Sequence, residues 1–259
     1  MKILFIGDVV GKGGRRAVTE LLPKLIDQGV DFVIANGENA SGGMGITPPH
    51  AEQLLDAGIN CITSGNHIWR KKELISFLEG DPHILRPANY PPGTPGRGSG
   101  IYTTRNGTKV GVVNLEGRVF MRPLESPFQR AEEHVSSLRK ETKVIIVDFH
   151  AEATSEKMAM GWFLDGEVSA VLGTHTHVQT ADERLLPGGT AYITDVGMTG
   201  PRDSVIGVKK EIALERFLTM LPNKFEPASG RVELQGAIVE VDERTGLSSG
   251  IRRVKRGLE

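Results

Sequence analysis

Short apolar runs alternate along the first half of the chain with stretches in which apolar residues recur at helical spacing. In chain order the pattern predicts strand, helix, strand, helix and strand over Ile3–Ile6, Arg15–Gln28, Phe32–Ala35, His50–Ala57 and Cys61–Thr63. This alternation is typical of βαβαβ units and predicts a mainly parallel sheet.

Turn and cap residues support these boundaries. Thr47 followed by Pro48 is typical of a helix N-cap and first turn, and Gly29 and Gly58 stand where the two helices should stop. Pro23 argues against an unbroken first helix, because proline removes a backbone hydrogen bond and usually kinks a helix.

The second half of the chain adds antiparallel signals. A loop rich in Pro and Gly at 89–100 precedes a predicted hairpin, Gly100–Thr104 and Lys109–Val113, whose Asn106-Gly107 turn favours type I′. Helices are predicted at 127–140 and 155–164, and strands at 144–149, 169–172, 231–241 and 250–254. We find no repeat, low-complexity tract or linker, and therefore expect one α/β domain over residues 1–259 with antiparallel additions.

Charge and cysteine content narrow the class of protein. Lys and Arg number 31 and Asp and Glu 32, so a net charge of -1 gives no broad field for binding a long nucleic acid, although it does not exclude a small phosphate compound. Cys61 is the single cysteine and lies in an apolar run, so we expect a buried thiol, no intramolecular disulfide and a reducing compartment. The N-terminal apolar run turns polar at Gly7-Asp8, too early for a signal peptide or a membrane span. We therefore expect a soluble, cytoplasmic protein without a membrane partner.

Residues of the kinds that bind metals gather at the ends of five predicted strands. They are Asp8; Asn36, Glu38 and Asn39; Asn66 and His67; His150; and His175 and His177. In an open parallel sheet the carboxyl ends of the strands lie on one edge, where ligands bind, so these side chains can converge. Each group alone also fits a cap, a loop or a surface hydrogen bond, except His175-Thr176-His177, where alternate residues of an extended chain would bring two imidazoles toward one site. The coincidence of all five groups indicates metal-dependent chemistry.

A glycine-rich stretch, Gly7–Gly14, lies between the first predicted strand and helix, where a phosphate cradle would lie. Its spacing fits neither the dinucleotide motif G-x-G-x-x-G nor the P-loop, whose Gly-Lys must be followed by Ser or Thr, because Gly13 follows Lys12. The stretch therefore argues against a nucleotide cofactor or an NTPase.

The strand-end residues resemble the five motifs of calcineurin-like metallophosphoesterases. The motifs are Gly7-Asp8, Asn36-Gly37-Glu38-Asn39, Gly65-Asn66-His67, His150 and Gly173-Thr174-His175-Thr176-His177. The runs DFHAEATSEK at 148–157 and GTHTHVQTAD at 173–182 are similar to the YmdB family of bacterial phosphodiesterases, and the likeness extends from Met1 to about Gly200. It implies a four-layer fold, with two mixed β-sheets flanked by helices, and hydrolysis of phosphodiesters, among them 2′,3′-cyclic nucleotides such as 2′,3′-cAMP.

Two motifs depart from the broader superfamily in the manner of the YmdB pattern: Val10 replaces a usual His, and Asn36–Asn39 replaces the usual Gly-Asp-x-x-Asp. The resemblance then implies two metal ions. It assigns Asp8, Asn39 and His177 to one ion, Asn66, His150 and His175 to the other, and Glu38 as the bridge. A shared carboxylate is what two divalent ions about 3.5–4 Å apart need to offset their repulsion. The oxygen and imidazole set suits Fe, Mn, Zn or Co, and the resemblance favours iron or manganese.

The expected reaction is in-line attack on phosphorus by a hydroxide between the two metals. His67 is the candidate general acid for the departing ribose oxygen, unless it only orients a ligand. Two rival functions are a metal-dependent hydrolase of non-phosphate bonds and a regulatory module that binds metal and nucleotide without turnover. We also expect a homo-oligomer, because sheet proteins of this kind often form symmetric assemblies.

Weaker candidates surround these motifs. Lys12, Arg15 and Arg16 are candidates for phosphate contact, the segment Ser41–Gly45 for lining the pocket, Thr199 and Arg202 for nucleotide contact, and Glu152 for fixing an imidazole.

Overall fold

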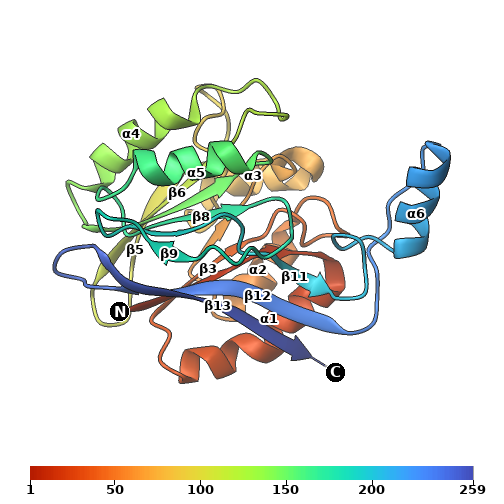
Figure 1. Cartoon of the computed structure of the whole chain (residues 1–259), viewed down its shortest axis with the longest axis horizontal. Coiled ribbons are helices and arrows are strands. Elements are labelled where there is room, and N and C mark those ends of the chain that lie inside the picture. The colour runs from red at the N-terminus through yellow and green to blue at the C-terminus, as the bar shows by residue number, and fades with distance from the viewer. Residues whose placement is uncertain (259) are drawn as a thin grey trace.

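A computed structural model describes residues 1–258, which build two β-sheets packed between layers of helices (Figure 1). The helices are α1 (Gly11–Asp27), α2 (Pro48–Asp56), α3 (Glu73–Gly80), α4 (Pro127–Leu138), α5 (Thr154–Phe163) and α6 (Lys210–Thr219), with a short 3-10 turn η1 (Ile68–Arg70). The first sheet has the order β2 (Asp8–Val9), β11 (Met198–Pro201), β12 (Val232–Val241), β1 (Lys2–Ile6), β3 (Phe32–Asn36) and β4 (Cys61–Thr63), and β13 (Ser248–Leu258) also pairs with β12. The second has the order β5 (Ser99–Thr103), β6 (Lys109–Glu116), β7 (Val144–His150), β8 (Ala170–Thr174), β10 (Ala191–Ile193) and β9 (Arg184–Leu185).

Both sheets are mixed. In the first, β1, β3 and β4 run parallel, whereas β12 is antiparallel to β1 and to β13. In the second, β6, β7, β8 and β10 run parallel, and β5 and β9 are antiparallel at the edges. The expected four-layer α/β fold is confirmed. The parallel arrangement predicted for the βαβαβ strands is confirmed in β1, β3 and β4. The expectation that all five ligand-bearing strand ends lie on the edge of one sheet is wrong, because apolar runs show which segments are strands but not which strands pair.

Three apolar clusters fill the three interfaces between the layers. Successive side chains of a strand point to opposite faces, so Leu4 and Ile6 of β1 pack with α1 and α2, whereas Ile3 and Phe5 pack toward the second sheet. A third cluster lies between the second sheet and α4 and α5, which cover its outer face (Figure 1). Because the two sheets share the middle cluster, we propose that the chain is one domain.

Several local predictions need correction. The helix α1 begins at Gly11 and continues through Pro23. Thr47 and Pro48 are the N-cap and first-turn residues of α2, as predicted, but the Thr47 hydroxyl lies 3.0 Å from Nδ1 of His50 and makes no capping hydrogen bond to the backbone. The sequence pattern did not predict α3, α6 or the short strands β9, β10 and β11. Only Ala213 of α6 is buried, so that helix lacks the apolar stripe from which periodicity is recognised.

Within residues 1–258, no helix is both long and apolar enough to cross a membrane.

Candidate metal centre

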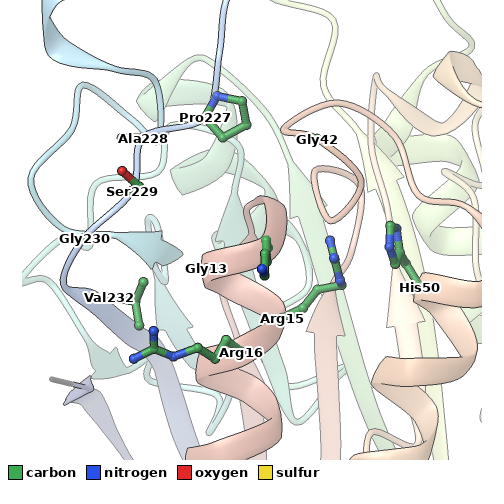
Figure 2. A pocket seen from close by; sticks show the side chains of 11 residues that line it. Gly13, Arg15, Arg16, Gly42, His50, Pro227, Ala228, Ser229, Gly230 and Val232 are labelled. Carbon is green, nitrogen blue, oxygen red and sulfur yellow. The ribbon is translucent and has the colours of Figure 1, made fainter.

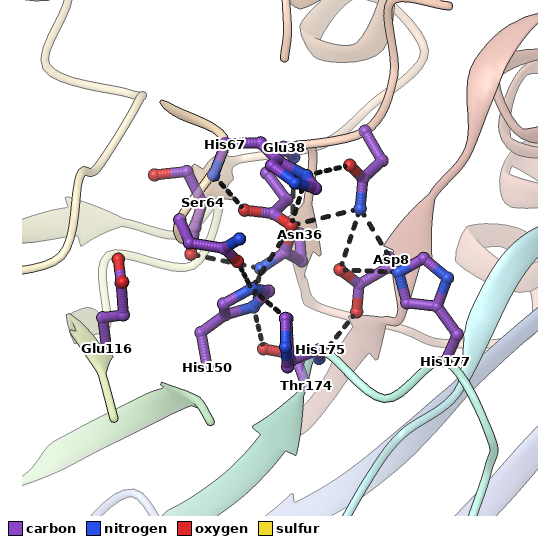
Figure 3. Close-up of polar contacts among 12 residues, drawn as sticks. Asp8, Asn36, Glu38, Ser64, His67, Glu116, His150, Thr174, His175 and His177 are labelled. Atoms are coloured by element: carbon purple, nitrogen blue, oxygen red, sulfur yellow. Dashed lines mark hydrogen bonds and ion pairs between the residues drawn. The ribbon is translucent and has the colours of Figure 1, made fainter. Parts of the chain in front are cut away.

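The carboxyl ends of strands from both sheets meet at one polar centre (Figure 3). The first sheet supplies Asp8 after β1, Glu38 and Asn39 after β3, and Asn66 and His67 after β4. The second sheet supplies His150 at the end of β7, and His175 and His177 after β8. All of the strand-end residues singled out from the sequence thus come together, between two sheets rather than along the edge of one.

Glu38 is buried and contacts several of these residues. Its Oε1 lies 3.2 Å from Nε2 of His150 and 3.3 Å from Nδ1 of His67. The backbone N–H of His67 donates to Oε2 at 3.0 Å, and Nδ2 of Asn39 donates to Oε1 at 3.1 Å. Glu38 therefore contacts residues from both of the expected ligand groups.

One ligand group surrounds His150. Ligand atoms of Glu38, His150 and His175 all lie within 4.8 Å of one another. Nε2 of His150 is 3.0 Å from Oδ1 of Asn66 and 3.1 Å from Nδ1 of His175. Metal–ligand bonds of about 2.0–2.2 Å keep the ligands of one ion within about 4.4 Å of each other. The separations from Nε2 of His150 to Oε1 of Glu38, Oδ1 of Asn66 and Nδ1 of His175 are 3.2 Å or less and therefore suit a single cation.

The other group joins Asp8, Asn39 and His177. Nε2 of His177 lies 3.5 Å from Oδ1 of Asp8 and 3.2 Å from Nδ2 of Asn39. Asn39 turns this nitrogen toward the carboxylates and its Oδ1 toward His67, 2.7 Å from Nδ1. Rotation of the amide by half a turn exchanges the two atoms and presents Oδ1, the atom a cation needs, to the centre.

Burial and neighbouring charges shift the pKa values of three residues of the centre. Burial opposes a charge on His150, but the neighbouring carboxylates of Glu38 and Asp8 outweigh burial and raise its pKa to about 10. Burial likewise opposes ionisation of Glu38, yet His150 and His67 bring its pKa well below the usual value. In contrast, burial and the nearby His150 lower the pKa of His175 to about 3. Positive charge is therefore favoured beside Glu38, and the His175 imidazole is neutral, as a metal ligand must be.

His150 is oriented by a buried chain of hydrogen bonds that the sequence analysis missed. Its Nδ1 lies 2.8 Å from Oγ1 of Thr174, which donates to Oδ1 of Asp148 at 2.7 Å. Nδ2 of Asn36 donates to the other oxygen of Asp148 at 3.1 Å. This chain fixes the ring so that Nε2 faces the centre. Asp148 precedes His150 by two residues on β7 and shares its face, a signal that the sequence did offer.

The two histidines after β8 have left-handed backbone conformations, contrary to the extended chain expected from the sequence. The backbone of His175 has φ 97° and that of His177 φ 65°, in the left-handed region that few non-glycine residues adopt. Asp195 fixes the residue between them, because its Oδ2 accepts hydrogen bonds from both the backbone and the hydroxyl of Thr176 and pairs with the buried Lys157 at 2.8 Å. Such strain persists only where its surroundings hold it.

A contact from far along the chain orients His177. Its Nδ1 lies 2.9 Å from the backbone oxygen of Ile206, which leaves Nε2 facing Asp8. Ile206 is the second residue of the segment 205–228, which carries α6 away from the sheets (Figure 1) and is here called the α6 arm. No sequence motif marks this contact.

Gly65 allows the loop after β4 to pack against His150. A Cβ atom at this position would lie 2.1 Å from Cδ2 and 2.3 Å from Nε2 of the imidazole. The side chain of any other residue would therefore displace the ring, which explains a glycine immediately before Asn66.

Most of the weaker candidates lie outside the centre. Lys12, Arg15 and Arg16 line a neighbouring cavity of about 390 Å³ (Figure 2), where Nε of Arg15 donates to Gln53. The expected nucleotide contact of Thr199 is wrong, because this residue is wholly buried and its hydroxyl donates to the backbone of Gln235. Arg202 pairs with Glu233 at 3.2 Å and lines a cavity of about 400 Å³ that also includes His177, so its nucleotide contact stays a prediction.

Glu152 does lie beside an imidazole of the centre. Its Oε2 is 3.1 Å from Nε2 of His175, so the ring it contacts is His175 rather than the nearer-in-sequence His150.

Comparisons with known proteins agree with this arrangement. The model of the family described as YmdB-like protein matches residues 4–254. A 2′,3′-cyclic-nucleotide 2′-phosphodiesterase from Bacillus subtilis is 51% identical over 255 residues, which cover 98% of this chain and 96% of that protein.

Solved structures show the same fold. A hypothetical protein from Thermus thermophilus superposes with a TM-score of 0.93 at 43% identity over 99% of both chains. A protein described as a novel phosphatase, from Mycoplasma pneumoniae, superposes with a TM-score of 0.92 at 37% identity over 99% of this chain and 93% of that one. The family expected from the motifs is confirmed, and the chain belongs to the YmdB-like proteins.

Proposed function

We propose that the protein is a phosphodiesterase that hydrolyses 2′,3′-cyclic nucleotides with two divalent metal ions. The observation that carries the proposal is the position of Glu38, a buried carboxylate in contact with both His150 and Asn39, and so with both ligand groups. The Bacillus subtilis relative, named for action on 2′,3′-cyclic nucleotides, supports the substrate class. Cleavage of the bond to the 2′ oxygen, which that name specifies, would leave a 3′-phosphate.

The donor set fits the two ions. Asp8, Asn39 and His177 would hold one ion and Asn66, His150 and His175 the other, with Glu38 between them. Carboxylates, amides and imidazoles without a thiolate suit iron or manganese, the pair favoured by the family resemblance. Cys61 takes no part, because it is buried in β4 and burial raises the pKa of its thiol to about 12. When bound, the ions would acidify a water and neutralise charge on the phosphoryl oxygens.

In this proposal, His67 would supply the proton that the leaving oxygen needs. Its Nδ1 is engaged by Asn39 at 2.7 Å and by Glu38 at 3.3 Å, so Nε2 is left for the substrate. The side chain is 20% exposed, whereas those of Glu38 and His150 are at most 1% exposed. His67 therefore lies at the mouth of the centre, where the departing ribose oxygen would leave.

The test is turnover of 2′,3′-cAMP by protein stripped of metal and reloaded with Mn²⁺ or Fe²⁺. The wild type should bind two ions per chain and regain activity, and Glu38→Gln should lower kcat/KM at least about 100-fold, since even residues that only orient ligands are worth about 10–100-fold. Glu20→Gln is the matched control, because Glu20 is an exposed carboxylate whose partner is Arg16. Full activity in the chelated protein or in Glu38→Gln would refute the proposal. Metal and nucleotide binding without turnover would instead indicate a regulatory binding module.

A further inference from the structure

A cavity of about 410 Å³ opens directly beside His177. It lies between the Gly42–Met44 loop on one side and the α6 arm on the other, and Val10, the residue before α1, also lines it. Cavities of about 300–1,000 Å³ are typical of sites for small molecules. A ligand in it would therefore reach the metal centre at His177.

The lining of this cavity is largely apolar. Val10, Met44, Val208 and Phe225 contribute apolar side chains, and those of Met44 and Phe225 are each 37% exposed. The guanidinium of Arg216 lies 4.7 Å from the centre of the Phe225 ring and helps to hold that ring in place. Partly exposed apolar side chains around a recess favour a ligand with an apolar surface of its own.

The α6 arm packs against the Gly42–Met44 loop, which lines the other side of this cavity. A Cβ atom on Gly43 would lie 3.1 Å from Cγ of Pro227, so the glycine lets Pro227 pack closely on the loop. Within the arm, Val208 bridges to Pro227 and the backbone of Ala228 donates to the oxygen of Gly207 at 2.8 Å. The recess is therefore formed before any ligand binds, which lowers the entropic cost of binding.

A polar group in the lining lacks a partner. Nδ2 of Asn223 is buried and makes no hydrogen bond to any residue in the described range 1–258. A buried donor without an acceptor is unfavourable, so a turn of the Asn223 side chain toward an acceptor on a ligand would remove the penalty. The recess thus offers apolar contact together with an amide that can donate once its side chain turns inward.

We propose that this cavity receives the base of the substrate nucleotide while its phosphate lies at the metal centre. The proposal rests on the function proposed above. A nucleobase has apolar faces for Phe225 and Met44 and hydrogen-bond acceptors on its edge for Asn223. The cavity lined by Lys12, Arg15 and Arg16 (Figure 2) is cationic and does not include His177. Phe225, Met44 and Asn223 are thus residues that select for a base.

The test compares two substrates that share the cyclic phosphate. One is 2′,3′-cAMP, and the other is the 2′,3′-cyclic phosphate of methyl riboside, which lacks a base. Phe225→Ala should lower kcat/KM for 2′,3′-cAMP about tenfold more than for the methyl riboside, a loss within the range for removing an aromatic partner of a base. Phe217→Ala is the matched control, because Phe217 is a 74% exposed phenylalanine of α6 that does not line the cavity, and it should leave the ratio unchanged.

Asn223→Ala tests the polar contact separately. It should lower kcat/KM for 2′,3′-cAMP about two- to tenfold relative to the methyl riboside, as expected for one hydrogen bond. Thermal unfolding of all three variants checks that the fold is intact. If the wild type turns over both substrates and neither Phe225→Ala nor Asn223→Ala changes their ratio, the base pocket is refuted and the proposed function stands. If the wild type turns over neither substrate, the proposed function fails and this proposal fails with it.

Discussion

Replacement of Thr174 by Val should weaken metal binding, although Thr174 is not itself one of the proposed metal ligands. The hydroxyl of Thr174 stands between Nδ1 of His150, at 2.8 Å, and Oδ1 of Asp148, at 2.7 Å. Valine has nearly the same shape, so Thr174→Val removes two hydrogen bonds and leaves the packing in place. Asn36 does not replace the hydroxyl as a partner of His150, because its Nδ2, 3.4 Å from the same ring nitrogen, is a donor like the Nδ1–H itself.

The size of the effect follows from burial. Thr174, Asp148 and His150 are all 0% exposed, so water cannot replace the lost hydroxyl. Leaving buried polar groups without partners costs about 1–3 kcal/mol of unfolding free energy. Loss of a group that orients a metal-bound imidazole lowers metal affinity about 10–100-fold.

The assay is a competition titration of Mn²⁺ against a chelator, together with urea unfolding. The matched control is Thr190→Val, because the hydroxyl of Thr190 is equally buried, donates to the oxygen of Val168 at 2.7 Å and lies away from the centre. Both variants should lose comparable stability, and only Thr174→Val should lose affinity for the metal. Wild-type affinity in Thr174→Val, or an equal loss in Thr190→Val, would show that the hydroxyl does not orient His150.

Three further predictions concern other residues. His67→Ala should lower kcat on 2′,3′-cAMP at least about 100-fold but affect bis(p-nitrophenyl) phosphate far less, because nitrophenolate leaves without a proton; equal losses on the two substrates would contradict general-acid catalysis. Asp195→Asn should lower the urea-derived free energy of unfolding by about 3–5 kcal/mol, because Lys157 would stay buried without its carboxylate partner, and an unchanged urea midpoint would contradict this. Cys61 should react with a disulfide reagent at pH 8 only after urea unfolding, because burial raises its pKa to about 12 and keeps the folded thiol protonated; rapid reaction of the native protein would show that the thiol is accessible.

The parts of the site that could be predicted from sequence are those that lie at strand ends. Runs such as Val144–Phe149 are apolar enough to mark a buried strand, so the polar residue that follows, His150, stands out. The pairing of strands could not be predicted in this way, because an apolar run does not indicate which other strand it pairs with. The ligand-type residues of β3 and β7 consequently lie in two different sheets, although the sequence pattern suggested one.

Residues that act on the centre through contacts distant in sequence could not be predicted. The backbone oxygen of Ile206 has no side-chain signature, yet it orients His177. The left-handed backbone of His175 is likewise invisible in sequence, because glycine or asparagine would be expected there. The expected homo-oligomer stays a prediction.

The hydrogen bond between His177 and Ile206 couples the position of the α6 arm to the affinity of the centre for a cation. Among the described residues, α6 carries highly exposed apolar side chains, including Phe217 and Leu218, at the far end of this arm. Any event that displaces the arm at Ile206 also releases the His177 ring, so cation affinity and arm position are linked and each must influence the other by the same free energy. A protein or small molecule that binds α6 and moves the arm would thereby change the affinity of the centre for a cation.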